Sequence, residues 1–174
     1  MRRTEDVMRT TRAFVVVVLV AVSLGGAAEA QLSRRVALEW PAVDGEGLAS
    51  LRLGLDEAQA PGLFGAPDTV AASPIGDRRL DYEVAPGVRL EVHVLAGRIH
   101  ALGLSAAGSG PPVRSPQTIR GIRLGMSLST VAERYGDPRD GRFWYPEAGI
   151  AFNVGGSADT VESILVFPPG TPAP

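Results

Sequence analysis

Two stretches of the chain decide its fold: residues 51–67, LRLGLDEAQAPGLFGAP, and residues 122–138, IRLGMSLSTVAERYGDP. They align without a gap at an offset of 71 and share an Arg-Leu-Gly triplet and a final Gly-x-Pro. A second match follows at an offset of 62, between GVRLEV at 87–92 and GIAFNV at 149–154. Two matches in the same order predict an internal duplication. The drop from 71 to 62 assigns nine additional residues to the first copy, most simply within 68–77.

Each copy is expected to contain one short helix. In the second copy Ser127 is a helix N-cap, apolar residues recur at helical spacing through Tyr135, and Gly136 suits a left-handed helix end. In the first copy Asp56 takes the cap position, but Pro61 removes a backbone donor and clashes with the preceding turn. We therefore expect a shorter or bent helix in the first copy.

Strands are expected after each helix. From Val88 to Val94, apolar and polar residues alternate with the period of a strand buried on one face. The segment IHALGL at 99–104 also matches VESILV at 161–166, again at the offset of 62. The expected strands cover residues 79–84, 88–94, 98–104, 142–145, 150–154 and 160–167.

The fold class expected from these patterns is α+β, with two tandem modules that each have a short helix plus about three antiparallel strands. One unit of about 60 residues buries only a marginal core, so we expect the two sheets to lie side by side or to be continuous. The expected organisation is a signal peptide at 1–30, an N-terminal extension at 31–47, repeat 1 at 48–105, a linker at 106–117, repeat 2 at 118–167 and a disordered tail at 168–174.

The first thirty residues have the pattern of a secretory signal. Four arginines precede an apolar run at 13–24, and Ala28-Glu29-Ala30 is the small-x-small site that signal peptidase requires. The alternative is an uncleaved membrane anchor, but the run is shorter than the ~20 apolar residues needed to cross a bilayer. Cleavage after Ala30 predicts a periplasmic or secreted protein with no membrane attachment.

The composition of residues 31–174 narrows the function classes. Thirteen arginines and 16 acidic residues give a net charge of 13 − 16 = −3, which does not indicate binding to nucleic acid. The absence of cysteine excludes disulfides, a Cys nucleophile, thiolate metal sites and a lipidated cysteine. The sequence has neither a Gly-x-Ser-x-Gly elbow nor a Gly-rich phosphate loop. We therefore expect no enzyme activity and no cofactor.

The second copy resembles a known repeat. Gly125-Met126-Ser127, then Val131, Gly136-Asp137-Pro138, an aromatic strand and a Gly-led alternating strand, is similar to the repeat of the β-lactamase inhibitor protein superfamily. It is similar as well to small outer-membrane assembly lipoproteins of the SmpA/OmlA type. The resemblance covers about residues 48–167 and implies an exported protein with helices on one face of an antiparallel sheet. The chain departs from both families in lacking cysteine, and the first copy has Leu55-Asp56 in place of Met-Ser.

His93 and His100 are the only histidines. A two-residue turn at Ala96-Gly97 places them opposite each other on the polar face of a hairpin, with Glu91 as the nearest further ligand. Two imidazoles are fewer ligands than a zinc or copper site uses. We therefore expect no metal site and two solvated side chains.

Aromatic strand residues form the candidate protein-binding surface. Tyr82 in the first copy, and Trp144 and Tyr145 in the second with Arg142 beside them, are residue types that dominate binding hot spots. The alternative for Trp144 is that it covers the edge of the core near Pro146.

These observations predict a non-catalytic exported module that binds an unidentified protein partner, in an inhibitor-like or envelope-assembly role. The alternative is an envelope protein that binds a small molecule or a metal in the cleft between the two copies. Neither interpretation involves nucleic acid.

Overall fold

The computed structural model describes residues 41–48, 50–107, 115–138, 142–154 and 159–172. The predicted signal peptide and most of the predicted N-terminal extension and linker lie outside these residues. Within them the chain forms two helices and two sheets, which confirms the α+β class. Neither helix is long and apolar enough to cross a membrane. The elements are β1 (Ala42–Val43), β2 (Gly47–Leu48), β3 (Leu51–Arg52), α2 (Gln59–Phe64), β4 (Thr69–Ala71), β5 (Arg78–Ala85), β6 (Val88–Leu95), β7 (Arg98–Ala106), α3 (Leu128–Tyr135), β8 (Phe143–Tyr145), β9 (Ile150–Val154) and β10 (Val161–Val166).

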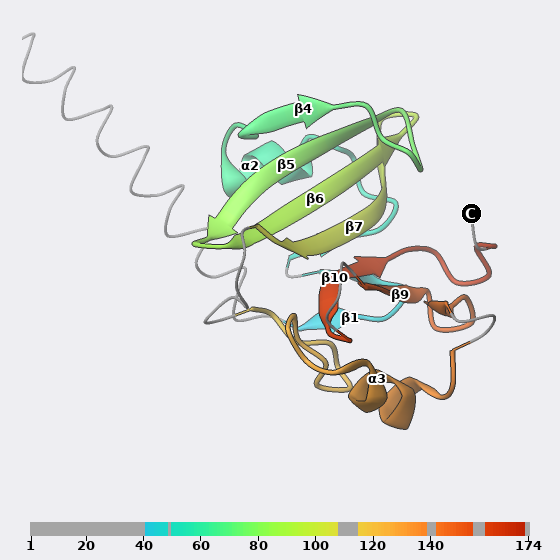
Figure 1. Cartoon of the computed structure of the whole chain (residues 1–174). Helices are drawn as coiled ribbons and strands as arrows, with labels where there is room; N and C mark the ends of the chain where they lie inside the picture. The colour runs from blue at the N-terminus through green and yellow to red at the C-terminus, as the bar shows by residue number, and fades with distance from the viewer. Residues whose placement is uncertain (1–40, 49, 108–114, 139–141, 155–158, 173–174) are drawn as a thin grey trace, which may run out of the picture.

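A seven-stranded antiparallel sheet with the order β4-β5-β6-β7-β10-β9-β8 organises the molecule (Figure 1). At its centre β7 pairs with β10, so the strands before and after the linker belong to one continuous sheet. All six expected strands are present, with ends within two residues of the predicted ones. The additional strand β4 lies inside the stretch 68–77 that the offsets identified as an insertion.

One face of this sheet, called here the inner face, carries the core. Alternate residues such as Leu90 on β6, Leu104 on β7 and Ile164 on β10 are each no more than 2% exposed. Phe64 of α2 and Val131 of α3 belong to the same apolar cluster. Residues of the small sheet β1-β2-β3 also join it, so both helices and the small sheet cover the inner face.

Helix α3 forms as the sequence predicts, whereas α2 begins later than expected. Ser127 caps α3 by accepting a hydrogen bond from the Thr130 N–H, and Gly136 follows its last residue with φ of 94°. The carboxylate of Asp56 instead accepts from the Ala58 N–H, and α2 begins only at Gln59. Pro61 thus lies in the first turn, where its missing N–H has no intrahelical role. The helix is shorter than α3, six residues against eight, as expected, but Pro61 lies within it rather than ending it.

Equivalent backbone hydrogen bonds join the start of each half to its last strand. The N–H of Gly54 donates to the Ile99 carbonyl over 2.7 Å, and the N–H of Gly125 donates to the Val161 carbonyl over 2.8 Å. The return bonds, from Ile99 to Leu55 and from Val161 to Met126, are both 2.8 Å long. Every one of these residues matches its counterpart at the offset of 71 or 62.

Residues 122–124 form no strand, although they align with residues 51–53 of the first copy, which include β3 paired with β2. Within the expected disordered tail at 168–174, the described residues 168–172 make contacts: the Gly170 N–H donates to the Pro146 carbonyl over 2.9 Å, and the Thr171 carbonyl accepts from the Trp144 indole over 3.3 Å. Local composition predicts fraying, but these contacts are with residues distant in sequence.

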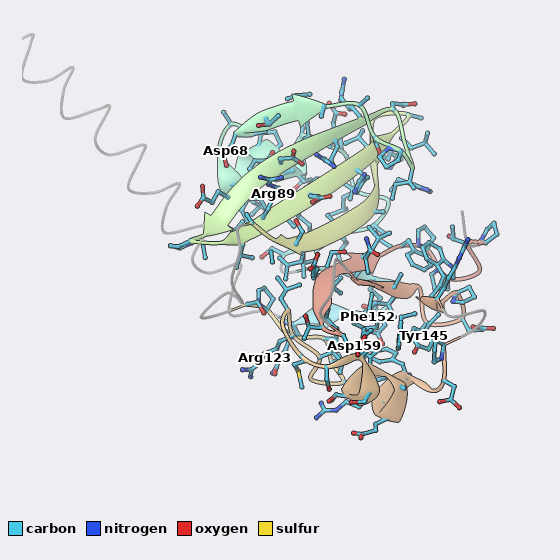
Figure 2. All side chains as sticks on the ribbon, viewed as in Figure 1. Asp68, Arg89, Arg123, Tyr145, Phe152 and Asp159 are labelled. Carbon is cyan, nitrogen blue, oxygen red and sulfur yellow. The ribbon has the colours of Figure 1, made fainter. Side chains whose placement is uncertain are left out.

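A polar cluster ties the β1–β2 turn to α3. The Tyr135 hydroxyl donates to Asp44 over 3.0 Å, and the Arg120 guanidinium lies 4.5 Å from the centre of the Tyr135 ring. Burial raises the pKa of Asp44, against the opposing effects of the Tyr135 hydrogen bond and the Arg120 charge. On its other side Tyr135 packs against Tyr145 and Phe152, which are labelled in Figure 2.

Candidate binding groove on the open face of the sheet

A row of side chains crosses the outer face of the sheet from β6 to β8. The strand register pairs Glu91 with Gly103, Gly103 with Leu165, Leu165 with Ala151, and Ala151 with Trp144. Residues that pair across strands point to the same face, here the face opposite the core. Because Gly103 and Ala151 are small, the row is hollow between a carboxylate at one end and an indole at the other.

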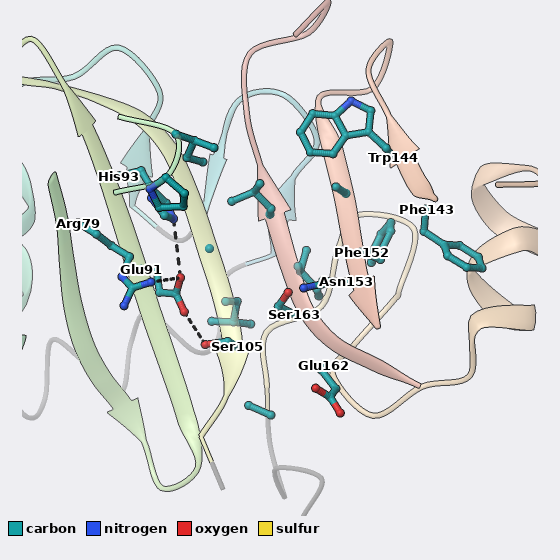
Figure 3. Close-up of a pocket in the computed structure, with 18 of the residues that line it drawn as sticks. Arg79, Glu91, His93, Ser105, Phe143, Trp144, Phe152, Asn153, Glu162 and Ser163 are labelled. Atoms are coloured by element: carbon teal, nitrogen blue, oxygen red, sulfur yellow. Dashed lines mark hydrogen bonds and ion pairs between the residues drawn. The ribbon is translucent and has the colours of Figure 1, made fainter. Parts of the chain in front are cut away.

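A groove of about 880 Å³ follows this row (Figure 3). Its floor includes three small polar residues from the adjacent row, Ser105, Ser163 and Asn153, which pair in that order across β7, β10 and β9. Gly103 deepens the floor, since a Cβ at this position would stand only 3.2 Å from the Glu91 Cβ. The groove therefore lies over the β7–β10 junction, where the two halves of the sheet meet.

One wall of the groove comes from the predicted insertion. Pro74 and Ile75, in the loop between β4 and β5, line the β6 end of the groove. The loop is held over β6 by Ser73, whose Oγ is 2.8 Å from His93 Nδ1 and accepts a hydrogen bond from the Ile75 N–H. Under this loop His93 is only 3% exposed.

The histidines do not face each other. The turn at Ala96 and Gly97 forms as expected, but a register shift follows it, so His93 pairs with Ala101 and His100 falls in the bulge. The predictions that His93 is opposite His100 and that it is solvated were therefore wrong. No group of three or more metal-ligating side chains occurs among the described residues.

A charged network forms the polar wall at the β6 end. Arg79 binds Asp81, with 2.7 Å between Nε and Oδ1, and lies 3.6 Å from Glu91 Oε2. Glu91 Oε1 accepts a hydrogen bond of 2.8 Å from the Ser105 hydroxyl, and its Oε2 is 3.7 Å from His93 Nε2. Hydrogen bonding by His93 and Ser105, together with the Arg79 charge, lowers the pKa of Glu91 despite its partial burial. Glu91 is therefore a carboxylate at neutral pH.

The opposite wall is aromatic. The Trp144 indole stacks on Phe167 with 4.1 Å between ring centres and 13° between ring planes, and its N–H donates to the Thr171 carbonyl over 3.3 Å. Trp144 thus packs over the outer face rather than over the edge of the main core near Pro146. Arg142 is exposed and lines the same end of the groove.

Only two of the four predicted protein-binding residues lie on this surface, Arg142 and Trp144. Tyr82 is fully buried on the inner face against Phe64, and Tyr145 is 9% exposed and donates its hydroxyl to the Gly136 carbonyl. The expectation that these two tyrosines contribute to an exposed surface was therefore wrong. Side chains alternate between the two faces of a strand, and both tyrosines occupy positions that face the core.

Sequence reasoning missed most of the groove. Glu91 entered it only as a possible metal ligand, and Gly103, Ser105, Leu165 and Ala151 were not singled out. The available signal was weak: small or polar residues at the outward positions of three expected strands. The register that brings them into one row is not readable from alternation alone.

No protein-family model matches the chain, and no curated protein matches its sequence. An extracellular protein containing an SCP domain, from Bacillus anthracis strain Ames, is similar in structure with 9% identity and a TM-score of 0.44, over 67% of this chain and 44% of that one. A cysteine-rich secretory protein from Staphylococcus aureus is similar with 12% identity and a TM-score of 0.45, over 74% of this chain and 48% of that one. The chain spans less than half the length of either. These likenesses identify neither family nor activity, and the resemblance to the β-lactamase inhibitor and assembly-lipoprotein repeats stays a prediction.

Proposed function

We propose that this chain is a non-catalytic exported protein that binds a segment of a partner protein in the groove on the outer face. The observation that carries the proposal is the row from Glu91 to Trp144, which puts a carboxylate, a hollow floor of mostly small residues and a rigid indole on one open surface. Trp is among the residue types most enriched in binding hot spots, and here its stacking on Phe167 fixes its orientation before binding.

The shape of the groove favours a protein segment over a small molecule. Glu91 and Trp144 lie four strand spacings apart, which corresponds to roughly 19 Å at ~4.8 Å per spacing. Small ligands bind in concave sites that bury most of their surface, whereas this groove is long and open along the sheet. The alternative, a small-molecule or metal-binding protein, is supported by the position of the groove over the β7–β10 junction between the two halves.

A catalytic alternative is weaker. Ser73, His93 and Glu91 follow one another in the hydroxyl–imidazole–carboxylate order of nucleophilic hydrolases. However, His93 is 3% exposed, and among the described residues that line the groove are Pro74 and Ile75 but not Ser73. His93 also lines the groove, but with Ser73 outside the lining the set lacks a nucleophile placed to reach a substrate bound there. We assign this set to holding the groove wall.

The two halves are proposed to descend from one duplicated module. The recurrence of the Gly54–Ile99 and Gly125–Val161 hydrogen bonds supports this history. The β7–β10 pairing supports it as well, because Leu102 pairs with Val166 and Leu104 pairs with Ile164, and the offset of 62 converts one pair into the other. Such self-complementary pairing is what a two-fold relation between equivalent units produces.

The test is a selection of random displayed peptides on the purified protein, followed by binding to variants with a filled groove. Ser163→Trp and Asn153→Trp add an indole to the floor, and Ser50→Trp adds one at an exposed turn of the small sheet. Melting temperatures establish that each variant is folded. Selected peptides should lose binding to both groove variants and keep binding to Ser50→Trp. Peptides that bind all four proteins equally would overturn the proposal.

A further inference from the structure

The polar wall of the groove has more negative than positive charge. Asp81 and Glu91 share one guanidinium, that of Arg79, which lies 2.7 Å from Asp81 Oδ1 and 3.6 Å from Glu91 Oε2. With two carboxylates and one guanidinium the network carries a net charge of −1. Glu162 and Arg142, both exposed, also line the groove and balance each other in charge.

Glu91 retains capacity for another donor. Its Oε1 accepts a hydrogen bond from the Ser105 hydroxyl, whereas Oε2 is 3.6 Å from Arg79 Nη1 and 3.7 Å from His93 Nε2, beyond hydrogen-bond distance. A carboxylate has about four acceptor positions, so Oε2 has room for an incoming N–H group. Arg79 is held closer to Asp81 than to Glu91, and it does not saturate the carboxylate. The Glu91 side chain is 19% exposed, on the side that faces the groove.

The two ends of the row set a spacing for the partner. About 19 Å separates Glu91 from Trp144, and an extended chain advances ~3.3 Å per residue, so about six residues span the groove. Charged side chains reach several ångströms beyond their backbone, so contacts at the two ends correspond to residues about four to six positions apart. Between them the row is apolar at Leu165 and Ala151, which suits small or aliphatic side chains, while the adjacent row of Ser105, Ser163 and Asn153 is polar.

We infer that the partner is an extended protein segment that places an arginine or lysine on Glu91 and, about four to six residues away, an apolar or aromatic side chain on Trp144. This inference rests on the proposed function and specifies the chemistry of its partner. Charge complementarity at the Glu91 end selects the cation, since a charge-assisted hydrogen bond to a partly buried carboxylate is roughly twice as strong as a neutral one. An acidic segment is disfavoured at this end by the net negative charge of the Asp81–Arg79–Glu91 network.

The experiment uses the peptides whose binding depends on the groove. Each is resynthesised with citrulline in place of arginine, and affinity is measured for the wild-type protein, for Glu91→Gln and for the control Glu133→Gln, whose side chain is exposed on α3. The Glu91→Gln substitution keeps the shape of the side chain and an acceptor for the Ser105 hydroxyl. We expect the citrulline peptide and Glu91→Gln each to weaken binding about tenfold, and Glu133→Gln to leave it unchanged. Added salt should weaken wild-type binding more than Glu91→Gln binding.

Three results would each overturn a different part of the reasoning. Peptides that need the open groove but contain no cation, or that bind Glu91→Gln as well as wild type, overturn this inference and leave the proposed function standing. Absence of any groove-dependent peptide overturns the proposed function itself. Agmatine that binds as tightly as the arginine peptide overturns the protein segment in favour of a small cationic ligand.

Discussion

Replacing Gly149 with alanine should destabilise the protein much more than the same change at its sequence counterpart, Gly87. Both glycines have a positive φ, of 66° and 75°, so either substitution costs about 1–2 kcal/mol for a left-handed L-residue. At Gly87 the new Cβ would meet nothing closer than the Ala107 carbonyl at 3.5 Å, an ordinary contact. At Gly149 it would stand 2.3 Å from the Phe167 carbonyl and 2.6 Å from the Gly45 Cα.

The clash at Gly149 involves backbone on both sides, so it cannot be relieved by a side-chain rotation. The Gly149 carbonyl also accepts hydrogen bonds from the Phe167 and Gly45 N–H groups, over 2.9 Å and 3.3 Å, and any shift strains both. Overpacking of a well-packed site typically costs about 1–3 kcal/mol. We therefore expect a total loss of about 2–5 kcal/mol for Gly149→Ala, against about 1–2 kcal/mol for Gly87→Ala.

Urea unfolding of the full chain at neutral pH measures both losses. With a slope of about 2 kcal/mol per molar urea, the midpoint of Gly149→Ala should fall about 0.5–1.5 M below that of Gly87→Ala. Equal midpoints for the two variants would refute the close approach of the β1–β2 turn to β9. An unchanged slope is required for the comparison, since a changed slope signals a different unfolded or native state.

Three further outcomes are expected. Because the pKa of Glu91 in the folded state lies below 4.5, its negative charge stabilises the fold at neutral pH, and this contribution is lost as the pH falls through the folded-state pKa. The stability difference between wild type and Glu91→Gln should therefore shrink on acidification, which denaturant midpoints measured as a function of pH will show. Burial raises the pKa of Asp44 above 3.8, so the ionised side chain is disfavoured in the folded state. The Asp44→Asn variant should therefore be more stable than wild type at pH 7 and lose this advantage below pH 3.8; an Asp44→Asn variant that is less stable at pH 7 would contradict this. Trp144→Ala removes the ring stack on Phe167 and the hydrogen bond to Thr171, so thermal and urea unfolding should show that the free energy of unfolding falls by about 1–3 kcal/mol. An unchanged free energy of unfolding would mean that the indole is not fixed against the sheet.

Local sequence signals predicted the elements with little error because the interactions behind them are local. The Ser127 cap and Gly136 define α3 through hydrogen bonds and a φ value that involve only neighbouring residues. Alternation identified β6 because a strand buried on one face repeats every two residues. The error at α2 was of the same local kind: Pro61 was assigned to a helix interior, although it is compatible with a first turn.

The candidate site depends on information of a different kind. Its row contains residues from β6, β7, β10, β9 and β8, and each neighbour pair depends on a register between strands. A bulge at His100 on β7 moved it away from His93, and no periodicity within β6 or β7 indicates a bulge. The loop over His93 then buried a side chain that its polar neighbours suggested was solvated.

The sequence by itself determined six of the strands, the α3 helix and the turn glycines, because spacing, caps and backbone permissiveness act over a few residues. Only the tertiary structure decided that the sheet is continuous through β7 and β10, that Tyr82 and Tyr145 are buried, and that Glu91 and Trp144 stand at the two ends of one groove. The physical reason is that a one-residue change of register reverses which side chains share a face, and register is selected by burial of the whole inner face rather than by any single strand.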